Sequence, residues 1–144
     1  MHICSINMKT IFQIGNKKKY TKVVGLNDLA EFESGQVHKV YGTFALGRDA
    51  EWSSRLFVLE MKEEDEEGIG TFLNITHKSP ALLGDTVVFE ACISKLEKNS
   101  IDCTVTATVG ERIIAECSTG QKIITKEKLN LLFESLKWNE WKSR

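Results

Sequence analysis

The sequence predicts an α+β fold in which an antiparallel sheet wraps around one central helix and a further helix follows at the C-terminus. Two patterns carry this prediction. Apolar and small residues recur at helical spacing over residues 42–59, and apolar residues alternate with a period of two over later segments. A chain of 144 residues is long enough for one domain with a modest hydrophobic core.

The segment 42–59 is expected to be a helix whose buried stripe consists of small residues. Gly47, Ala50 and Ser54 recur at helical spacing, and Glu51 lies on the same stripe. Small side chains let a helix approach another backbone closely. This pattern favours a helix that is wrapped by a sheet over one that lies on the surface.

The downstream segments are expected to form an antiparallel meander. Alternate apolar residues run from Val87 to Ile93 and from Ile101 to Val109, and a third long strand is expected over Arg112–Thr125. The connections between these strands have hairpin length, which permits only antiparallel neighbours. The segment 69–77 alternates more loosely and is expected to be the strand that follows the helix.

The C-terminal segment is expected to be a helix that Thr125 caps. Its apolar residues fall at positions i, i+3, i+4 and i+7, namely Leu129, Leu132, Phe133 and Leu136. Trp138 and Trp141 are expected to dock this helix on the rest of the protein. For domain organisation, residues 1–19 are expected to be an N-terminal extension and residues 20–144 a single domain.

Composition and charge argue against several classes of function. The formal net charge of −1 gives no electrostatic footprint for nucleic acid, and no apolar run approaches the ~20 residues that span a bilayer. We therefore expect neither nucleic-acid nor membrane partners. The N-terminus lacks the pattern of a secretory signal, so we expect a cytoplasmic protein. The four cysteines have no zinc-site spacing, so we expect reduced thiols and no metal site.

Residues suited to acyl transfer gather in the helix and the strand that follows it. A hydroxyl (Thr43), a carboxylate (Glu51) and an imidazole (His77) occur within this unit. Gly68 and Gly70 flank the start of the strand, where glycine permits close backbone approach and can offer an N–H donor to a carbonyl. A lone carboxylate on a buried stripe is costly unless it is paired, which favours a functional role for Glu51.

Each of these residues also has a purely structural interpretation. Thr43 is placed to be the helix N-cap, and a lone histidine such as His77 is more often structural than catalytic. Asp49 lies two residues from Glu51 and therefore on another side of the helix, and we interpret it as solvated. The charged run at residues 62–67 is expected to be a solvated loop.

In their order and spacing, these motifs resemble the hotdog-fold thioesterases, and in particular the branch typified by fluoroacetyl-CoA thioesterase. The segments that carry the resemblance are Ser34–Thr43, Glu51, Glu67–Thr71, Thr76–His77 and Gly84. The similarity of arrangement extends from about Val23 to Phe133, which is most of the chain. The resemblance implies a hotdog fold, with a site at the boundary between two subunits.

The resemblance also implies an activity and a set of site residues. The chain is expected to hydrolyse an acyl-CoA thioester, with Thr43, Glu51 and His77 as the catalytic residues. Gly70 is expected to present its backbone N–H to the thioester oxygen. Lys122 stands where the family often has an arginine near the acyl-CoA site, which keeps the charge but loses the bidentate fork.

The expected ligand is an acyl-CoA with a short acyl group, because the suggested pocket residues Val37, Val40, Tyr41 and Phe44 are apolar and hint at a compact pocket. Water suffices as co-substrate, so no cofactor is expected beyond the CoA moiety of the substrate. A single sheet around one helix leaves an open edge, so we expect a homodimer or a tetramer. The alternative hypothesis is a non-catalytic acyl-CoA-binding module or sensor.

Overall fold

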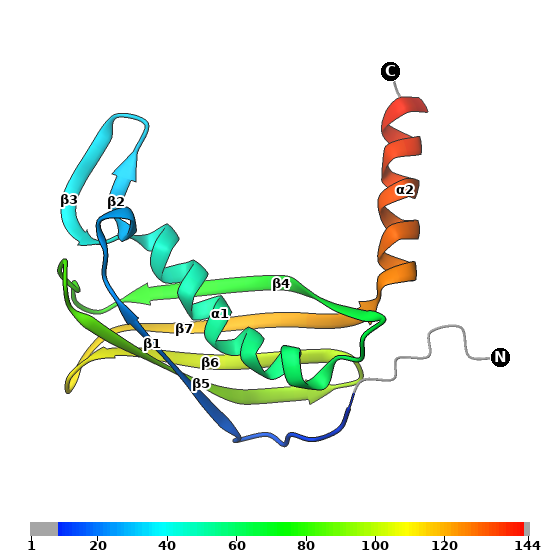
Figure 1. The fold of residues 1–144 in the computed structure, drawn as a ribbon, viewed down its shortest axis with the longest axis horizontal. Coiled ribbons are helices and arrows are strands. Elements are labelled where there is room, and N and C mark those ends of the chain that lie inside the picture. The colour runs from blue at the N-terminus through cyan, green and yellow to red at the C-terminus, as the bar shows by residue number, and fades with distance from the viewer. Residues whose placement is uncertain (1–8, 143–144) are drawn as a thin grey trace.

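The structure, a computed structural model, describes residues 9–142. It contains a five-stranded antiparallel sheet in the spatial order β1-β5-β6-β7-β4, which curves around helix α1 (Figure 1). The elements of this unit are β1 (Lys17–Val23), α1 (Thr43–Met61), β4 (Glu66–His77), β5 (Thr86–Glu97), β6 (Ser100–Val109) and β7 (Arg112–Thr125). The predicted arrangement of a sheet around a central helix is confirmed.

A short hairpin stands beside the N-terminus of α1 and was not predicted from the sequence. It consists of β2 (Leu29–Phe32) and β3 (Gly35–Tyr41), and the single-turn helix η1 (Leu26–Asp28) precedes it. Figure 1 shows the hairpin projecting beyond the sheet at that end of α1. The pairing of β2 with β3 shifts register twice within four residues, so the hairpin lacks the regular alternation that reveals a strand.

The alternating apolar residues of the predicted meander are buried in the structure. Each of the following is at most 1% exposed: Val87, Phe89, Ala91 and Ile93 on β5, and Ile101, Cys103, Val105 and Ala107 on β6. Together with Phe57 and Val58 of α1, they form the core between helix and sheet. The expected strands from Val87 to Ile93 and from Ile101 to Val109 are therefore confirmed.

Helix α1 and strand β4 approach closely because small residues line their contact. A β-carbon added at Gly47 would come 3.0 Å from side-chain atoms of both Leu73 and Ile75. One added at Gly68 would come 2.5 Å from Cγ1 of Val58. The predicted small-residue stripe is thus the surface that α1 turns toward the sheet, and glycine is needed on both elements.

A β-bulge in β4 decides which of its residues face α1. The pairing with β7 shifts register between Gly70 and Phe72. Gly70 faces Glu51 of α1 before the bulge, and His77 faces Thr43 of α1 after it. Residues 70 and 77 are an odd number of positions apart and would lie on opposite faces of a regular strand. The extra residue of the bulge brings both to the same face.

The C-terminal helix α2 (Lys126–Lys142) leaves the sheet at the end of β7 and points away from it (Figure 1). The predicted cap is confirmed, because the backbone N–H of Lys128 donates to Oγ1 of Thr125 at 3.2 Å. Trp138 is 58% exposed, so the prediction that it docks α2 on the body is wrong. The helix direction carries this side chain away from the core. The side chain of Trp141 lies outside the described part of the structure.

The segment before β1 is also packed against the fold. Strand β1 begins at Lys17, inside the stretch expected to precede the domain, and Phe12 packs edge-on against Phe57 with ring centroids 5.0 Å apart.

Within the expected solvated loop, Glu66 is fully buried, and its Oε1 accepts the backbone N–H of Glu63 at 2.9 Å. That residue starts β4, which corrects the prediction for it. Among residues 9–142, no helix is long and apolar enough to cross a membrane.

The close contact between α1 and β4 predicts the effect of a side chain at Gly68. We expect Gly68→Ala to lower the free energy of unfolding by about 1–3 kcal/mol, because the new methyl group overlaps Val58. Urea unfolding measures this loss. In the double variant with Val58→Ala, the loss of unfolding free energy should be smaller than the sum of the losses of the two single variants, by about 0.5 kcal/mol or more. Strict additivity would contradict the proposed overlap.

Candidate active site

The structure brings Thr43 and His77 together. Thr43 is the first residue of α1 and His77 is the last residue of β4, and Oγ1 of Thr43 lies 2.9 Å from Nε2 of His77. The helix N-cap is Gly42, and no side chain caps this end of α1. The prediction that Thr43 is the N-cap is therefore wrong, because its hydroxyl turns to the imidazole rather than to the backbone of α1.

This pair borders a groove of about 910 Å³ between the β2–β3 hairpin, the start of α1 and the end of β4. Its walls include apolar side chains, among them Leu29, Ala30, Val40, Tyr41, Phe44 and Pro80. Three of the suggested pocket residues, Val40, Tyr41 and Phe44, thus line this groove. Val37 lies on β3, but its side chain lies outside the described part of the structure. The groove presents an apolar wall to a hydroxyl and an imidazole that share a hydrogen bond.

Glu51 and Gly70 form a second pair farther along the helix. A β-carbon added at Gly70 would lie 3.0 Å from Oε2 of Glu51, so the missing side chain leaves room for the carboxylate. Glu51 is half-buried, and neither residue borders the groove. Glu51 follows Thr43 by eight residues, which corresponds to about 12 Å along a helix axis. Within one chain, the structure therefore keeps the two pairs apart.

Lys122 lies on the outer face of the sheet. Its neighbours Gln121 and Ile123 are buried toward α1, so alternation turns Lys122 the other way, and its side chain is exposed. The structure does not bring Lys122 to the Thr43–His77 pair. Gln121 instead faces the helix, and its Nε2 donates to Oγ of Ser54 at 3.2 Å. The signal that could have identified it is a polar residue in alternation with Ile123, at a position of β7 that alternation places on the inward face.

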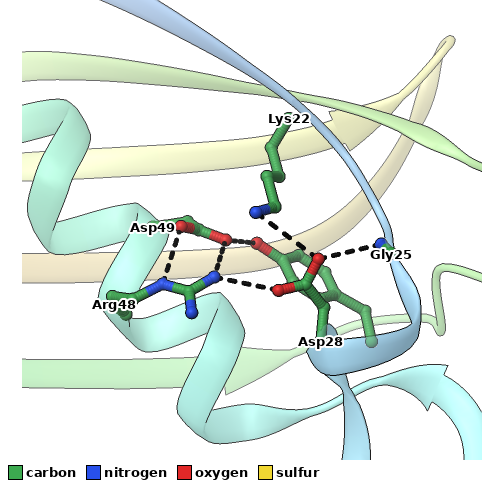
Figure 2. Close-up of polar contacts among 6 residues, drawn as sticks. Lys22, Gly25, Asp28, Arg48 and Asp49 are labelled. Atoms are coloured by element: carbon green, nitrogen blue, oxygen red, sulfur yellow. Dashed lines mark hydrogen bonds and ion pairs between the residues drawn. The ribbon is translucent and has the colours of Figure 1, made fainter.

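Two buried carboxylates and the charged partners that reach them from the surface form a cluster next to the groove (Figure 2). Asp49 is only 3% exposed, so the prediction that it is solvated is wrong. The Tyr41 hydroxyl donates to Oδ2 of Asp49, and Arg48 donates to both of its oxygens at 3.1 Å. Arg48 also donates to Oδ1 of Asp28 at 2.9 Å. Asp49 is buried because η1 and the end of β3 cover that side of α1.

The cluster perturbs its titratable groups. Burial by itself would raise the pKa of Asp28, but the Gly25 N–H, Arg48 and Lys22 together hold that pKa below its usual value. Burial and the neighbouring Asp49 carboxylate raise the pKa of Tyr41 far above its ordinary value, so its hydroxyl stays protonated and donates. The charges in the cluster are therefore matched by donors, as buried ions require.

Two buried thiols lie elsewhere in the core. Burial, together with Cys92 and Asp102, raises the pKa of Cys103 to about 12, and burial raises the pKa of Cys117 to about 11. Neither thiol is a nucleophile at neutral pH. The acyl-transfer chemistry of the described residues is thus concentrated at the hydroxyl–imidazole and carboxylate–glycine pairs.

Comparison with known proteins identifies the family. The family model of the fluoroacetyl-CoA-specific thioesterase FlK matches residues 24–127. None of the curated protein sequences compared with the chain matches it.

Solved structures agree with this match. A hypothetical protein from Thermus thermophilus, described as a thioesterase superfamily member, is 31% identical. That alignment covers 94% of this chain and 100% of the other, with a TM-score of 0.87. A mutant of FlK is 22% identical over 88% of this chain and 98% of its own, with a TM-score of 0.78. A hot-dog-like protein from Thermanaerovibrio acidaminovorans is 17% identical over 90% and 93%, with a TM-score of 0.75. The chain therefore belongs to the fluoroacetyl-CoA-specific thioesterase family, whose members are hydrolases with the hotdog fold.

Proposed function

We propose that this protein hydrolyses the thioester of a short-chain acyl-CoA. The observation that carries the proposal is the 2.9 Å contact between Thr43 Oγ1 and His77 Nε2 at the edge of an apolar groove. A hydroxyl beside an imidazole is the arrangement from which an activated nucleophile is built. Family membership supplies the reaction class, and this contact supports Thr43 and His77 as the residues that carry it out.

In this proposal His77 carries protons between the reacting groups. A neutral imidazole accepts the proton of the Thr43 hydroxyl when that hydroxyl attacks, or receives from Glu51 the proton that the carboxylate has taken from an attacking water. It then returns that proton to the sulfur as the C–S bond breaks, so that free CoA thiol leaves. If Thr43 attacks, water hydrolyses the resulting acyl-enzyme. Both routes consume one water and release one acid and one thiol, and neither requires a cofactor.

Glu51 and Gly70 act in this proposal on the carbonyl side of the thioester. The backbone N–H of Gly70 donates to the developing oxyanion, and the Glu51 carboxylate orients or deprotonates the attacking water. The half-buried position of Glu51 and its closeness to Gly70 support this assignment. Within one chain the Glu51–Gly70 pair is too far from the Thr43–His77 pair to act on the same substrate. The two pairs must therefore come from different chains.

A second copy of the chain offers that combination. β4 lies at an edge of the sheet and is open to pairing. When the bulge is counted as one step, Gly70 and His77 lie three steps on either side of Asn74. An antiparallel pairing of two β4 strands centred on Asn74 would place Gly70 opposite the partner's His77. We therefore propose a homodimer with two sites, each built from both subunits.

The short acyl chain is suggested by the aromatic residues at the groove. The rings of Phe32 and Phe44 meet edge-on with centroids 6.1 Å apart, between the hairpin and the start of α1. We propose that a compact acyl group contacts these apolar side chains at the groove. We also propose a cytoplasmic location, which the free Cys92, Cys103 and Cys117 support.

The hydroxyl–imidazole pair predicts the first kinetic test. We expect His77→Gln to lower kcat for acetyl-CoA by roughly 10²–10⁴-fold, because the proton carrier is lost. Thr43→Val should also lower kcat, and Thr43→Ser should restore part of it, since serine keeps the hydroxyl. The assay measures free thiol released from CoA esters of increasing chain length. Wild-type turnover in His77→Gln would exclude the assignment, and tight binding of acyl-CoA by the native protein without thiol release would favour the binding module.

The carboxylate predicts a separate result. We expect Glu51→Gln to lower kcat by on the order of 10²-fold or more, because the amide cannot accept a proton from water. Glu67→Gln is the matched control, since this half-buried glutamate of β4 pairs with Arg55 instead of facing Gly70. Single-turnover thiol release measures both variants. Equal losses in the two variants would show that Glu51 acts only through charge or stability.

The proposed dimer predicts the behaviour of its central residue. We expect sedimentation of the native protein to show a dimer, and Asn74→Asp to raise the dissociation constant up to about fivefold, because two like charges would then meet at the twofold axis. Added salt should reduce this effect. Asn130→Asp places the same charge on α2 and should leave the dissociation constant unchanged. A native protein that sediments only as a monomer would overturn the shared site.

A further inference from the structure

The buried cluster beside the groove contains more charge than packing alone would require. The two buried charges are Asp28 and Asp49, which are 5% and 3% exposed, and Arg48, whose side chain is 57% exposed, lies between them (Figure 2). Lys22 lies 3.4 Å from Oδ2 of Asp28, and the Gly25 N–H donates to the same oxygen at 2.8 Å. Replacing such a network by apolar side chains is often neutral or stabilising, so stability alone explains it poorly. A requirement for defined geometry explains it better.

Tyr41 connects this cluster to the groove. Tyr41 borders the groove, and its ring packs edge-on against Phe89, with centroids 6.4 Å apart. Its hydroxyl donates to Oδ2 of the buried Asp49. Its backbone N–H donates to the carbonyl of Ala81 at 2.9 Å. Tyr41 is thus held at its backbone and at the far end of its side chain.

The next residue, Gly42, is held just as closely. Its N–H donates to the backbone carbonyl of Asp28 at 2.8 Å, and a β-carbon there would lie 2.9 Å from Cα of Ala30. The Asp28 side chain is in turn fixed by Arg48 and the Gly25 N–H. The backbone that leads into Thr43 is therefore attached on one side to Asp49, through Tyr41, and on the other side to Asp28.

We propose that Asp49 and Arg48 are positioning residues, which act through Tyr41 and Asp28 to hold the hydroxyl of Thr43 in hydrogen-bond contact with His77. This inference rests on the proposed function for its kinetic meaning. Neither Asp49 nor Arg48 contacts Thr43 or His77 directly, and the effect passes through the backbone of residues 41–43. A misplacement of about 1 Å at a reacting group can lower a rate by roughly 10²-fold.

Tyr41→Phe tests the connection by removing only the hydroxyl that donates to Asp49. We expect kcat for a short acyl-CoA to fall by roughly 10-fold to 100-fold while KM changes by less than about twofold. Tyr20→Phe is a matched control. Tyr20 also stacks on Phe89, with centroids 6.1 Å apart, but its hydroxyl makes no hydrogen bond within residues 9–142. This control should keep the native kcat and KM.

Two substitutions at Asp49 test whether a hydrogen-bond acceptor at this position restores kcat. Asn keeps an oxygen that can accept from the Tyr41 hydroxyl, whereas Leu has a similar size and no acceptor. We expect Asp49→Leu to lose kcat as Tyr41→Phe does, and Asp49→Asn to recover a substantial part of it. Thermal unfolding is measured on every variant, so that a loss of folded protein is separated from a loss of turnover by the folded protein.

A measurement without substrate separates this inference from the proposed reaction. The ring nitrogens of His77 are followed by NMR in ¹⁵N-histidine-labelled protein, with Thr43→Val giving the spectrum of an imidazole that lacks the hydroxyl partner. We expect the Nε2 signal in Tyr41→Phe to move toward the Thr43→Val position and the signal in Tyr20→Phe to stay native.

The outcomes are distinct. If native protein releases no thiol from any acyl-CoA while the His77 signal still moves in Tyr41→Phe, the proposed function fails and the positioning role stands. If Tyr41→Phe keeps both the native kcat and the native His77 signal, the positioning role is overturned, even where its melting temperature falls. A rise in KM alone would also overturn it, because that result would make Tyr41 a binding residue only.

Discussion

The close contact between α1 and β4 is the constraint on which the rest of the structure depends. Gly47 on the helix and Gly68 on the strand remove the side chains that would hold the two backbones apart. A helix at this distance reaches β4 at two places, with Thr43 at His77 and Glu51 at Gly70. A bulkier stripe would still give a buried helix, but it would separate the hydroxyl from the imidazole.

The bulge in β4 makes the same contact chemically useful. It lets Gly70 and His77 share a face despite their odd separation, so both can meet residues of one helix. β-bulges recur at sheet edges and next to active sites, and this bulge occupies the edge strand that carries the candidate site. The helix stripe and the strand bulge are therefore two parts of a single arrangement.

The buried charges near the groove show a different balance of forces. Removing Asp28 and Asp49 from water costs free energy, and the donors around them offset that cost without making the cluster a strong source of stability. Such a network fixes the orientation of its side chains, because the planar fork of Arg48 and the hydroxyl of Tyr41 donate to Asp49 in only a few geometries. It surrounds the turn into α1, where displacement would matter most for the Thr43–His77 pair.

By itself, the sequence determined the features that depend on local periodicity. The alternation of β5 and β6, the small-residue stripe of α1 and the cap at Thr125 are patterns within a few residues of each other, and the structure agrees with them. Only the tertiary structure decided which faces became covered. Asp49 is buried because η1 and β3 return over α1, Trp138 is exposed because α2 leaves the sheet, and Thr43 bonds to His77 because a bulge turns that residue inward. These outcomes depend on contacts between distant segments, which no local pattern encodes.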